Sequence, residues 1–312
     1  MEDRNEHRPV LLDEVLEALN IQPEGFYFDG TFGRGGHAGA ILERLGSEAR
    51  LLAMDKDLEA ISFAEKNFAH DERFEIRQGS FAMMAEWLKD AGLTGKMDGV
   101  FFDLGVSSPQ LDNADRGFSF MKEGPLDMRM DTGRGQSATE WLADADEQVI
   151  SDVIRDFGEE RFHRRIAAAI VSKRLSEKLQ TTLQLAGLIE KVVPGREKGK
   201  HPATRTFQAI RIFMNRELDD LQKGLAQAVD ALKIGGRLAV ISFHSLEDRR
   251  VKRFIRDKAE GKRLPLDLPV QYEKTNAELK IVGKAIRPGA DEVKKNTRSR
   301  SATLRVAEKI KS

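Results

Sequence analysis

The sequence predicts an α/β protein in which a mostly parallel sheet is interrupted by an inserted helical subdomain. Two observations carry this prediction. Over the first 103 residues, four short apolar segments alternate with segments of helical periodicity, which is typical of parallel sheets built from strand–helix–strand units. The next convincing strand, at 236–243, lies about 130 residues beyond the fourth one, whereas a crossover unit needs roughly 30 residues. Most of that interval must therefore be an insertion.

The expected strands of the first half share an acidic end. They lie at 26–29, 50–55, 74–81 and 97–103. Three of them stop at an aspartate, namely Asp29, Asp55 and Asp103, while the remaining one ends in Gly-Ser-Phe81. Apolar residues at helical spacing predict helices at 9–19, 38–45 and 58–68.

Helical signals dominate the inserted part. Ser137-Ala-Thr-Glu140 has the pattern of a capping box. Further helices are expected at 147–157, 159–175 and 182–193. One long helix at 207–232 would return the chain to the sheet, and 299–307 alternates like an edge strand. We therefore divide the chain into a sheet domain made of residues 1–112 and 204–312, the latter with a basic C-terminal segment, and an inserted helical subdomain of residues 113–203.

Composition excludes several classes of site. The chain of 312 residues has no cysteine, so neither a disulfide framework nor a thiolate metal site is available. The six histidines show no paired spacing, and we expect no bound metal. The charged N-terminus lacks the apolar core of a secretion signal, and no apolar run approaches the roughly 20 residues of a membrane span. We expect a cytoplasmic protein that does not cross a membrane.

The net charge of zero hides an asymmetry. Residues 249–312 contain 19 Lys or Arg against 8 Asp or Glu, and the remainder contains 32 against 43. A basic end on an otherwise acidic chain indicates a polyanionic partner such as a nucleic acid. A solvated tail explains the composition equally well.

The segment between Phe26 and Gly39 predicts a nucleotide-type cofactor site. After the first acid, Asp29, five glycines occur within ten residues, and a helical pattern follows. A strand, a glycine loop and a helix start let a ligand approach the backbone closely. Asp55 lies about 20 residues farther on, where an acid binds ribose hydroxyls in dinucleotide folds. Phe81 is expected to cover an adenine ring, with an ordinary core aromatic as the alternative.

Two cofactors compete for this site. Gly33-Arg-Gly-Gly-His-Ala38 satisfies the G-x-G-x-x-A pattern of nicotinamide enzymes, but a single match of that kind is weak. Asp29 precedes the glycines, and its carboxylate would repel a pyrophosphate and attract a cationic sulfonium. The charge therefore favours S-adenosylmethionine.

Six motifs occur together and in order. They are Asp29-Gly-Thr-Phe-Gly-Arg-Gly-Gly-His37, Asp103-Leu-Gly-Val-Ser-Ser-Pro-Gln-Leu-Asp112, Arg116-Gly-Phe-Ser-Phe120, Gly124-Pro-Leu-Asp-Met-Arg-Met-Asp131, Lys200-His-Pro-Ala-Thr-Arg-Thr-Phe-Gln-Ala209 and Ser242-Phe-His-Ser-Leu-Glu-Asp-Arg249. With them the chain closely resembles the ribosomal RNA small-subunit methyltransferase H family, from about His7 to the C-terminus. Six long motifs in series are far more specific than one glycine loop.

The resemblance implies a Rossmann-like S-adenosylmethionine-dependent methyltransferase fold. It also implies methylation of the exocyclic N4 of a cytidine in the decoding region of small-subunit (16S) ribosomal RNA. Carried onto this sequence, the family's cofactor contacts fall on Gly35, Gly36, His37, Asp55, Phe81, Asp103 and Gln110. The partner would be this RNA, within the small ribosomal subunit. The sequence leaves the oligomeric state open, a homodimer included.

The chemistry requires placement more than activation. Holding the amine in line with an activated methyl group can supply roughly 7–11 kcal/mol of the barrier. Acceptors for the amine N–H bonds would make its lone pair available and later remove a proton. Related amino methyltransferases have a short Pro-Pro-aromatic turn after the fourth strand, and Asp103-Leu-Gly-Val-Ser-Ser-Pro109 departs from it. Asp103, Ser107 and Ser108 are therefore the candidate catalytic acceptors.

Contacts to RNA are expected from basic residues outside the cofactor loop. The candidates are Lys200, His201, Arg205 and Arg211, joined by Arg161, Arg164 and Arg165 and by the basic C-terminal segment. The polar face of a helical bundle explains the three insert arginines equally well, and a capped helix start explains His201. For His244 we expect a helix cap rather than catalysis. A nicotinamide-dependent oxidoreductase and a non-catalytic ribosome-assembly factor are the competing functions.

Overall fold

The computed structural model describes residues 8–195, 201–261 and 276–311. Contacts divide the chain into two compact units. The first unit contains residues up to Gly105 and from Asp219 onward, and the second runs from Val106 to Leu218. No described helix is both long and apolar enough to cross a lipid bilayer.

The first unit is built on a seven-stranded sheet in the order β3-β2-β1-β4-β5-β7-β6. Its strands are β1 (Phe26–Asp29), β2 (Arg50–Asp55), β3 (Phe74–Gln78), β4 (Met97–Asp103), β5 (Leu232–Ser242), β6 (Leu279–Ile281) and β7 (Thr303–Lys309). Strands β1 to β5 pair in parallel, and β7 runs antiparallel to both of its neighbours. The order of the first five strands is that of the Rossmann fold, which confirms the α/β prediction.

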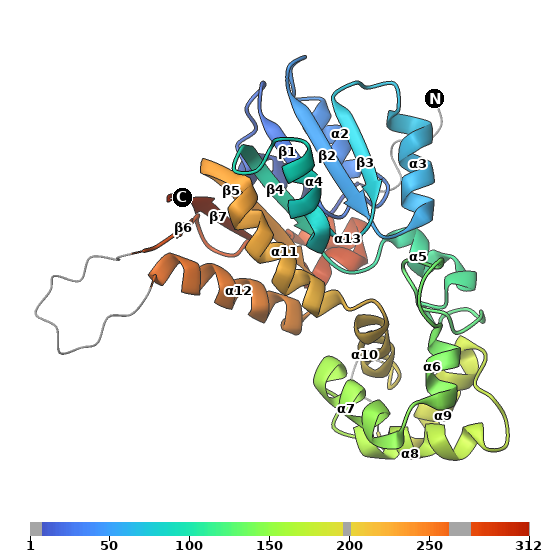
Figure 1. Ribbon diagram of the computed structural model, residues 1–312. Helices are drawn as coiled ribbons and strands as arrows, with labels where there is room; N and C mark the ends of the chain where they lie inside the picture. Colours follow the sequence, from blue (N-terminus) through green and yellow to red (C-terminus); the bar gives the residue numbers. More distant parts are fainter. Residues whose placement is uncertain (1–7, 196–200, 262–275, 312) are drawn as a thin grey trace, which may run out of the picture. The chain divides into compact units, whose positions relative to one another are not determined.

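Helices cover both faces of this sheet. On one face α1 (Leu12–Leu19), α2 (Gly36–Leu42) and α3 (Leu58–Phe68) contribute to a buried cluster with strand residues such as Tyr27 and Phe101. Side chains alternate along a strand, so Phe28 and Phe102 point to the other face. There α4 (Met84–Asp90) packs Trp87 against Phe28, and α11 (Glu217–Ala231) also covers this face (Figure 1).

The C-terminal half differs from expectation at the edge of the sheet. The strand expected as an edge is β7, but β6 lies outside it. The three-residue strand β6 is too short to give a periodic signal, so the sequence did not predict it. The last helices of this unit are α12 (Ser245–Glu260), which contacts β5, β6 and β7, and α13 (Ala290–Lys295).

The helix expected at 207–232 is two helices, and that prediction was wrong. Helix α10 (Thr204–Met214) ends at Asn215, Arg216 takes a left-handed φ of 52°, and α11 begins at Glu217. Asn215 explains the break, because its side chain accepts from Met130 N at 2.7 Å and donates to Met128 O at 2.8 Å. The apolar periodicity continued through the break because both helices bury one face.

The second unit is a helical bundle. It contains α5 (Ser108–Asp112), α6 (Ala138–Asp144), α7 (Glu147–Gly158), α8 (His163–Arg174), α9 (Thr182–Val192) and α10. Its core gathers side chains from all parts of the unit, including Trp141, Ile154, Ile170 and Phe207. Ser137 and Glu140 form the expected capping box at the start of α6. The unit is wider than 113–203 because Leu111 and α10 pack on the same core.

Residues of two of the six motifs, 116–120 and 124–131, stabilise a loop within the second unit. Arg116 is buried and donates to the carbonyls of Arg129 and Met130, both at 3.1 Å. Asp127 accepts two bonds from the Arg129 guanidinium, at 2.8 and 2.7 Å. Gly124 lies so close to Ala114 that an added Cβ would be 1.9 Å from its carbonyl oxygen. These motif residues therefore hold the loop in shape.

Candidate active site

Asp29, Asp55 and Asp103 end three neighbouring parallel strands, β1, β2 and β4. The register pairs Asp29 with Ala53 and with Phe101, so Asp55 and Asp103 each extend two residues beyond it. The carboxyl ends of parallel strands are where open α/β sheets bind their ligands. The expected gathering of the three acids at one edge is thus present in the fold.

Thr31 links the ends of β1 and β4. Its hydroxyl accepts from the backbone N–H of Asp103 at 2.6 Å and contacts Asp29 Oδ1 at 3.5 Å. Asp29 Oδ1 also accepts from Thr31 N at 3.0 Å. Burial raises the pKa of Asp29 to about 7, against these hydrogen bonds, which lower it. Asp29 therefore fixes the start of the glycine loop rather than facing a ligand directly.

Asp55 folds the glycine loop onto β2. Its two oxygens accept from Gly33 N at 2.8 Å and from Asp57 N at 2.9 Å. Gly33 has a φ of +57°, which a glycine adopts without a steric cost. Burial raises the pKa of Asp55 to about 6. A carboxylate offers about four lone-pair sites, so two remain for a pair of hydroxyls.

Asp103 is the least satisfied of the three acids. Its Oδ1 is buried and has no hydrogen-bond partner among the described residues. Burial, together with the negative charges of Asp29 and Glu247, raises the pKa of Asp103 to about 8. A buried acceptor without a donor costs free energy, so this oxygen marks a place for a ligand's N–H or for a positive charge.

His37 packs beside Asp103 as a neutral ring. The imidazole lies on Phe101 with ring centroids 4.7 Å apart, and its Nε2 is 3.0 Å from the carbonyl of Val10. Burial lowers the pKa of His37 to about 4. Because a carbonyl only accepts, Nε2 carries the proton and Nδ1 keeps its lone pair. This Nδ1 faces Asp103 Oδ2 at 3.8 Å.

The adjacent glycines have packing reasons of their own. Gly35 has a φ of +70°, and a Cβ there would be 2.6 Å from the Phe32 ring. A Cβ on Gly36 would be 2.4 Å from Pro9 Cγ. Both positions therefore require glycine for the loop itself to fold, whatever ligand lies near it.

Phe81 is placed as a core aromatic. Its ring stacks on Phe102 with centroids 4.5 Å apart. A Cβ on Gly224 of α11 would be 2.3 Å from the same ring. This packing favours the core role over a covering of adenine.

Ser107, Ser108 and Gln110 belong to the second unit. Gln110 is buried, and its Oε1 accepts from Ser107 N at 3.0 Å at the start of α5. Three residues separate Asp103 from Ser107 in the sequence, and the boundary between the two units falls among them, after Gly105. Gln110 thus shapes the turn that carries both serines.

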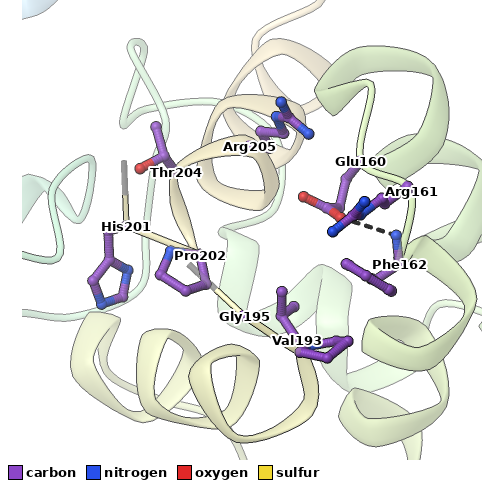
Figure 2. A pocket seen from close by; sticks show the side chains of 10 residues that line it. Glu160, Arg161, Phe162, Val193, Gly195, His201, Pro202, Thr204 and Arg205 are labelled. Atoms are coloured by element: carbon purple, nitrogen blue, oxygen red, sulfur yellow. Dashed lines mark hydrogen bonds between the residues drawn. The ribbon is translucent and has the colours of Figure 1, made fainter. Parts of the chain in front are cut away.

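Two of the four predicted RNA contacts line one pocket of the second unit. Figure 2 shows this pocket, of about 150 Å³, with His201 and Arg205 among its lining residues. Glu160 and Arg161 also line it, and the Glu160 carboxylate accepts from Phe162 N at 2.9 Å. His201 Nδ1 accepts from Ala203 N at 3.1 Å and so holds the turn before α10, but no side chain caps the helix itself.

The predicted RNA contact Arg211 is not among the lining residues of this pocket. Arg211 forms a bidentate pair with Glu217, with both N–O distances at 2.8 Å, and the two side chains are 15% and 9% exposed. This pair connects the two helices on either side of the Arg216 break. Lys200 lies outside the described residues.

Sequence reasoning missed a polar group next to Asp55. Asp220 of α11 pairs with Lys56 at 2.6 Å and accepts from Ser80 Oγ at 2.7 Å. Glu247 was missed as well; it is buried and accepts from Phe243 N at 2.8 Å. His244 caps α12, as expected, with its Nδ1 accepting from Glu247 N at 3.4 Å. The acid at the third position of a helix that follows a strand end was the available signal for Glu247.

Known proteins resemble this chain along nearly its whole length. The family model described as the MraW methylase family matches residues 4–310. A protein of Alteromonas mediterranea named ribosomal RNA small subunit methyltransferase H is 57% identical over 306 residues, covering 97% of each chain. Proteins with the same name are 57% identical in Thioalkalivibrio sulfidiphilus and 53% identical in Legionella pneumophila, covering 97% of this chain and 97% and 99% of those proteins. The chain therefore belongs to the MraW methylase family.

Proposed function

We propose that this protein transfers a methyl group from S-adenosylmethionine to the exocyclic N4 of a cytidine in small-subunit ribosomal RNA. Family membership supports a methylase, and the names of the relatives support this RNA as the substrate. The observation that carries the proposal in the structure is the unpartnered Oδ1 of Asp103 at the carboxyl edge of the sheet. The acceptor cytidine would lie in the decoding region, in RNA assembled into the small subunit.

The electrostatics of the edge support a cationic donor. Three carboxyl groups stand at adjacent strand ends, and their pKa values are raised to about 7, 6 and 8 for Asp29, Asp55 and Asp103. A nearby positive charge would stabilise their ionised forms. A pyrophosphate would add negative charge to the same edge, so the geometry argues against a nicotinamide dinucleotide.

The residues present fit the donor. Asp55 would bind its ribose hydroxyls with the lone pairs left by Gly33 and Asp57, and the loop at Gly35 and Gly36 would approach it through the backbone. When bound, S-adenosylmethionine supplies a methyl group already activated on a sulfonium. What remains for the protein is to place the acceptor amine and to receive its proton.

Asp103 is the residue we assign to that amine. Its Oδ1 has no donor among the residues that the structure describes, and an N4 amine has two N–H bonds to give. The cytosine amine becomes nucleophilic when its N–H bonds are held by acceptors and its lone pair is no longer delocalised into the ring. A carboxylate whose pKa is raised to about 8 is also a stronger base than an ordinary aspartate. Ser107 and Ser108 are the alternative acceptors.

Basic side chains near the carboxyl edge of the sheet would bind the RNA backbone. Helix α12 begins at the end of β5, and its exposed residues include Arg249, Lys252 and Arg253. Farther along, Arg256 is bonded to Asp257 and Lys258 to Glu278. Within α12, the exposed Lys252 and Arg253 of the first half are thus better suited to phosphates than these bonded residues. His201 and Arg205 are further candidates in the second unit.

Mass spectrometry of small-subunit RNA tests this function. RNA from cells that lack the protein should lose N4-methylation at one cytidine, and the purified protein with S-adenosylmethionine should restore it. An unchanged modification profile would reject the proposal. If Asp103→Ala restores the mark as fast as the wild type, the catalytic assignment fails and a non-catalytic assembly role gains support.

A further inference from the structure

One stripe of helix α11 lies along the turn that follows β3. Asp220, Gly224 and Gln227 recur at spacings of four and three residues, which places them on one face of the helix. Asp220 accepts from Ser80, Gly224 contacts the Phe81 ring, and Gln227 Nε2 donates to Ala82 O at 2.7 Å. The stripe therefore fixes the turn at 80–82 over its whole length.

Asp220 differs from the rest of the stripe because it also reaches β2. Lys56 directly follows Asp55, and its Nζ lies 2.6 Å from Asp220 Oδ2. The two side chains are 19% and 14% exposed, so water screens their interaction less than it would on the open surface. One carboxylate thus joins the ends of β2 and β3 to α11.

Both ends belong to the proposed donor site. Gly79 N donates to Asp55 O at 2.8 Å, which ties the turn after β3 to the acid itself. We infer that Asp220 is a positioning residue for the nucleoside end of the methyl donor, acting through Lys56 beside Asp55 and through Ser80 before Phe81. This inference deepens the proposed function and rests on it.

The charged groups around Asp55 lead to a prediction about its pKa that distinguishes two variants. Burial raises the pKa of Asp55, and the backbone N–H groups of Asp57 and Gly33 lower it. Of the charged side chains, Asp57 raises this pKa and Lys56 lowers it, and the Asp55 charge in turn raises the pKa of Asp29. Lys56→Met removes the favourable charge, so the pKa of Asp55 should rise. Asp220→Asn removes the negative charge that pairs with Lys56, so the pKa should fall. Two variants that break the same ion pair thus move one pKa in opposite directions.

Binding and NMR measurements on the full chain test this. The dissociation constant of S-adenosylmethionine at pH 8 should rise about tenfold in both variants, which is about 1.4 kcal/mol, with kcat at saturating donor unchanged. The Asp55 carboxyl carbon, followed by NMR in the unliganded protein, should titrate lower in Asp220→Asn and higher in Lys56→Met. Gln227→Met is the matched control. It removes two hydrogen bonds to the same turn region, to Ala82 O and from Ala85 N, and should change neither quantity.

The outcomes separate this inference from the proposed function. If the wild type does not bind S-adenosylmethionine, the proposed function itself fails. If the wild type binds and methylates, but the two variants bind like the wild type or Gln227→Met loses as much affinity, only the positioning role fails. Equal thermal unfolding of the three variants shows that they are folded.

Discussion

The Nδ1 atom of His37 lies 3.8 Å from Oδ2 of Asp103, with the neutral imidazole held by the carbonyl of Val10 on its other side. Neither atom brings a proton to this contact when Asp103 is ionised, so the ring does not stabilise the carboxylate. A histidine with a pKa lowered to about 4 cannot supply a positive charge at neutral pH. That charge has to come from a ligand.

Donor binding should therefore release protons. The pKa of Asp103 is raised to about 8 and that of Asp29 to about 7, so both are partly protonated at pH 7, and a bound cation lowers both values. Affinity for S-adenosylmethionine should rise from pH 6 to pH 9. Calorimetry in buffers of different ionisation enthalpy measures the release, and Asp103→Asn should reduce it. Uptake of protons on binding would contradict this explanation.

Stability should fall as the pH rises across the same range. Asp29, Asp55 and Asp103 have pKa values of about 7, 6 and 8 in the fold, above the ordinary 3.8. The folded state then binds more protons than the unfolded state between these values, so the free energy of unfolding decreases with pH. The stabilisation is complete below about pH 4 and is lost through pH 6 to 8. Urea unfolding of the unliganded protein should show this slope, and Asp103→Asn should flatten its upper part.

The first half of α12 should contribute to RNA affinity through charge alone. For single-stranded RNA each contacted phosphate contributes about −0.7 to the slope of log affinity against log salt. Lys252→Gln with Arg253→Gln should therefore make the slope shallower by about 1.4. Lys66→Gln with Lys89→Gln is the matched control, because both lysines are exposed on helices over the β1–β3 half of the sheet. Equal slopes in the two double variants would reject the α12 contact.

Asn215 should be a structural residue of the second unit. Its buried amide bridges Met130 N, Met128 O and Arg211 O at 2.7, 2.8 and 2.9 Å. Asn215→Ala leaves buried backbone groups unpaired and should cost about 2–4 kcal/mol of unfolding free energy. Denaturant unfolding followed by far-UV circular dichroism measures the loss. Donor affinity should stay unchanged in the folded variant, because Met128, Met130 and Arg211 are not among the predicted cofactor contacts.

The sequence predicted the sheet edge well because local signals specify it. The strands at 26–29, 50–55 and 97–103 begin and end as expected, since each buried apolar run stops at an aspartate. The break at Asn215 and Arg216 was missed because the left-handed residue is an arginine, and no glycine or proline marks it. Its cause lies in bonds to Met128 and Met130, far along the chain.

The parts of the site that the sequence did not predict also depend on contacts between residues far apart in the chain. Asp55 and Asp103 could be predicted as candidate site residues from their place at strand ends. The link from Ser80 to Asp220 spans 140 residues and has no local pattern, so only the fold reveals it. The same holds for the aromatic Phe81, whose packing against Phe102 and Gly224 depends on a helix that returns after the insertion.

Methyl transfer by Asp103→Asn tests the central claim most directly. Small subunits from cells that lack the protein would be incubated with S-adenosylmethionine and either the wild type or the variant, and N4-methylcytidine in their RNA would be quantified by mass spectrometry. The wild type should methylate one cytidine, and the variant should be slower by about 10²- to 10⁴-fold at saturating donor. Methylation by the variant at the wild-type rate, or a mark on another atom of the base, would contradict the account.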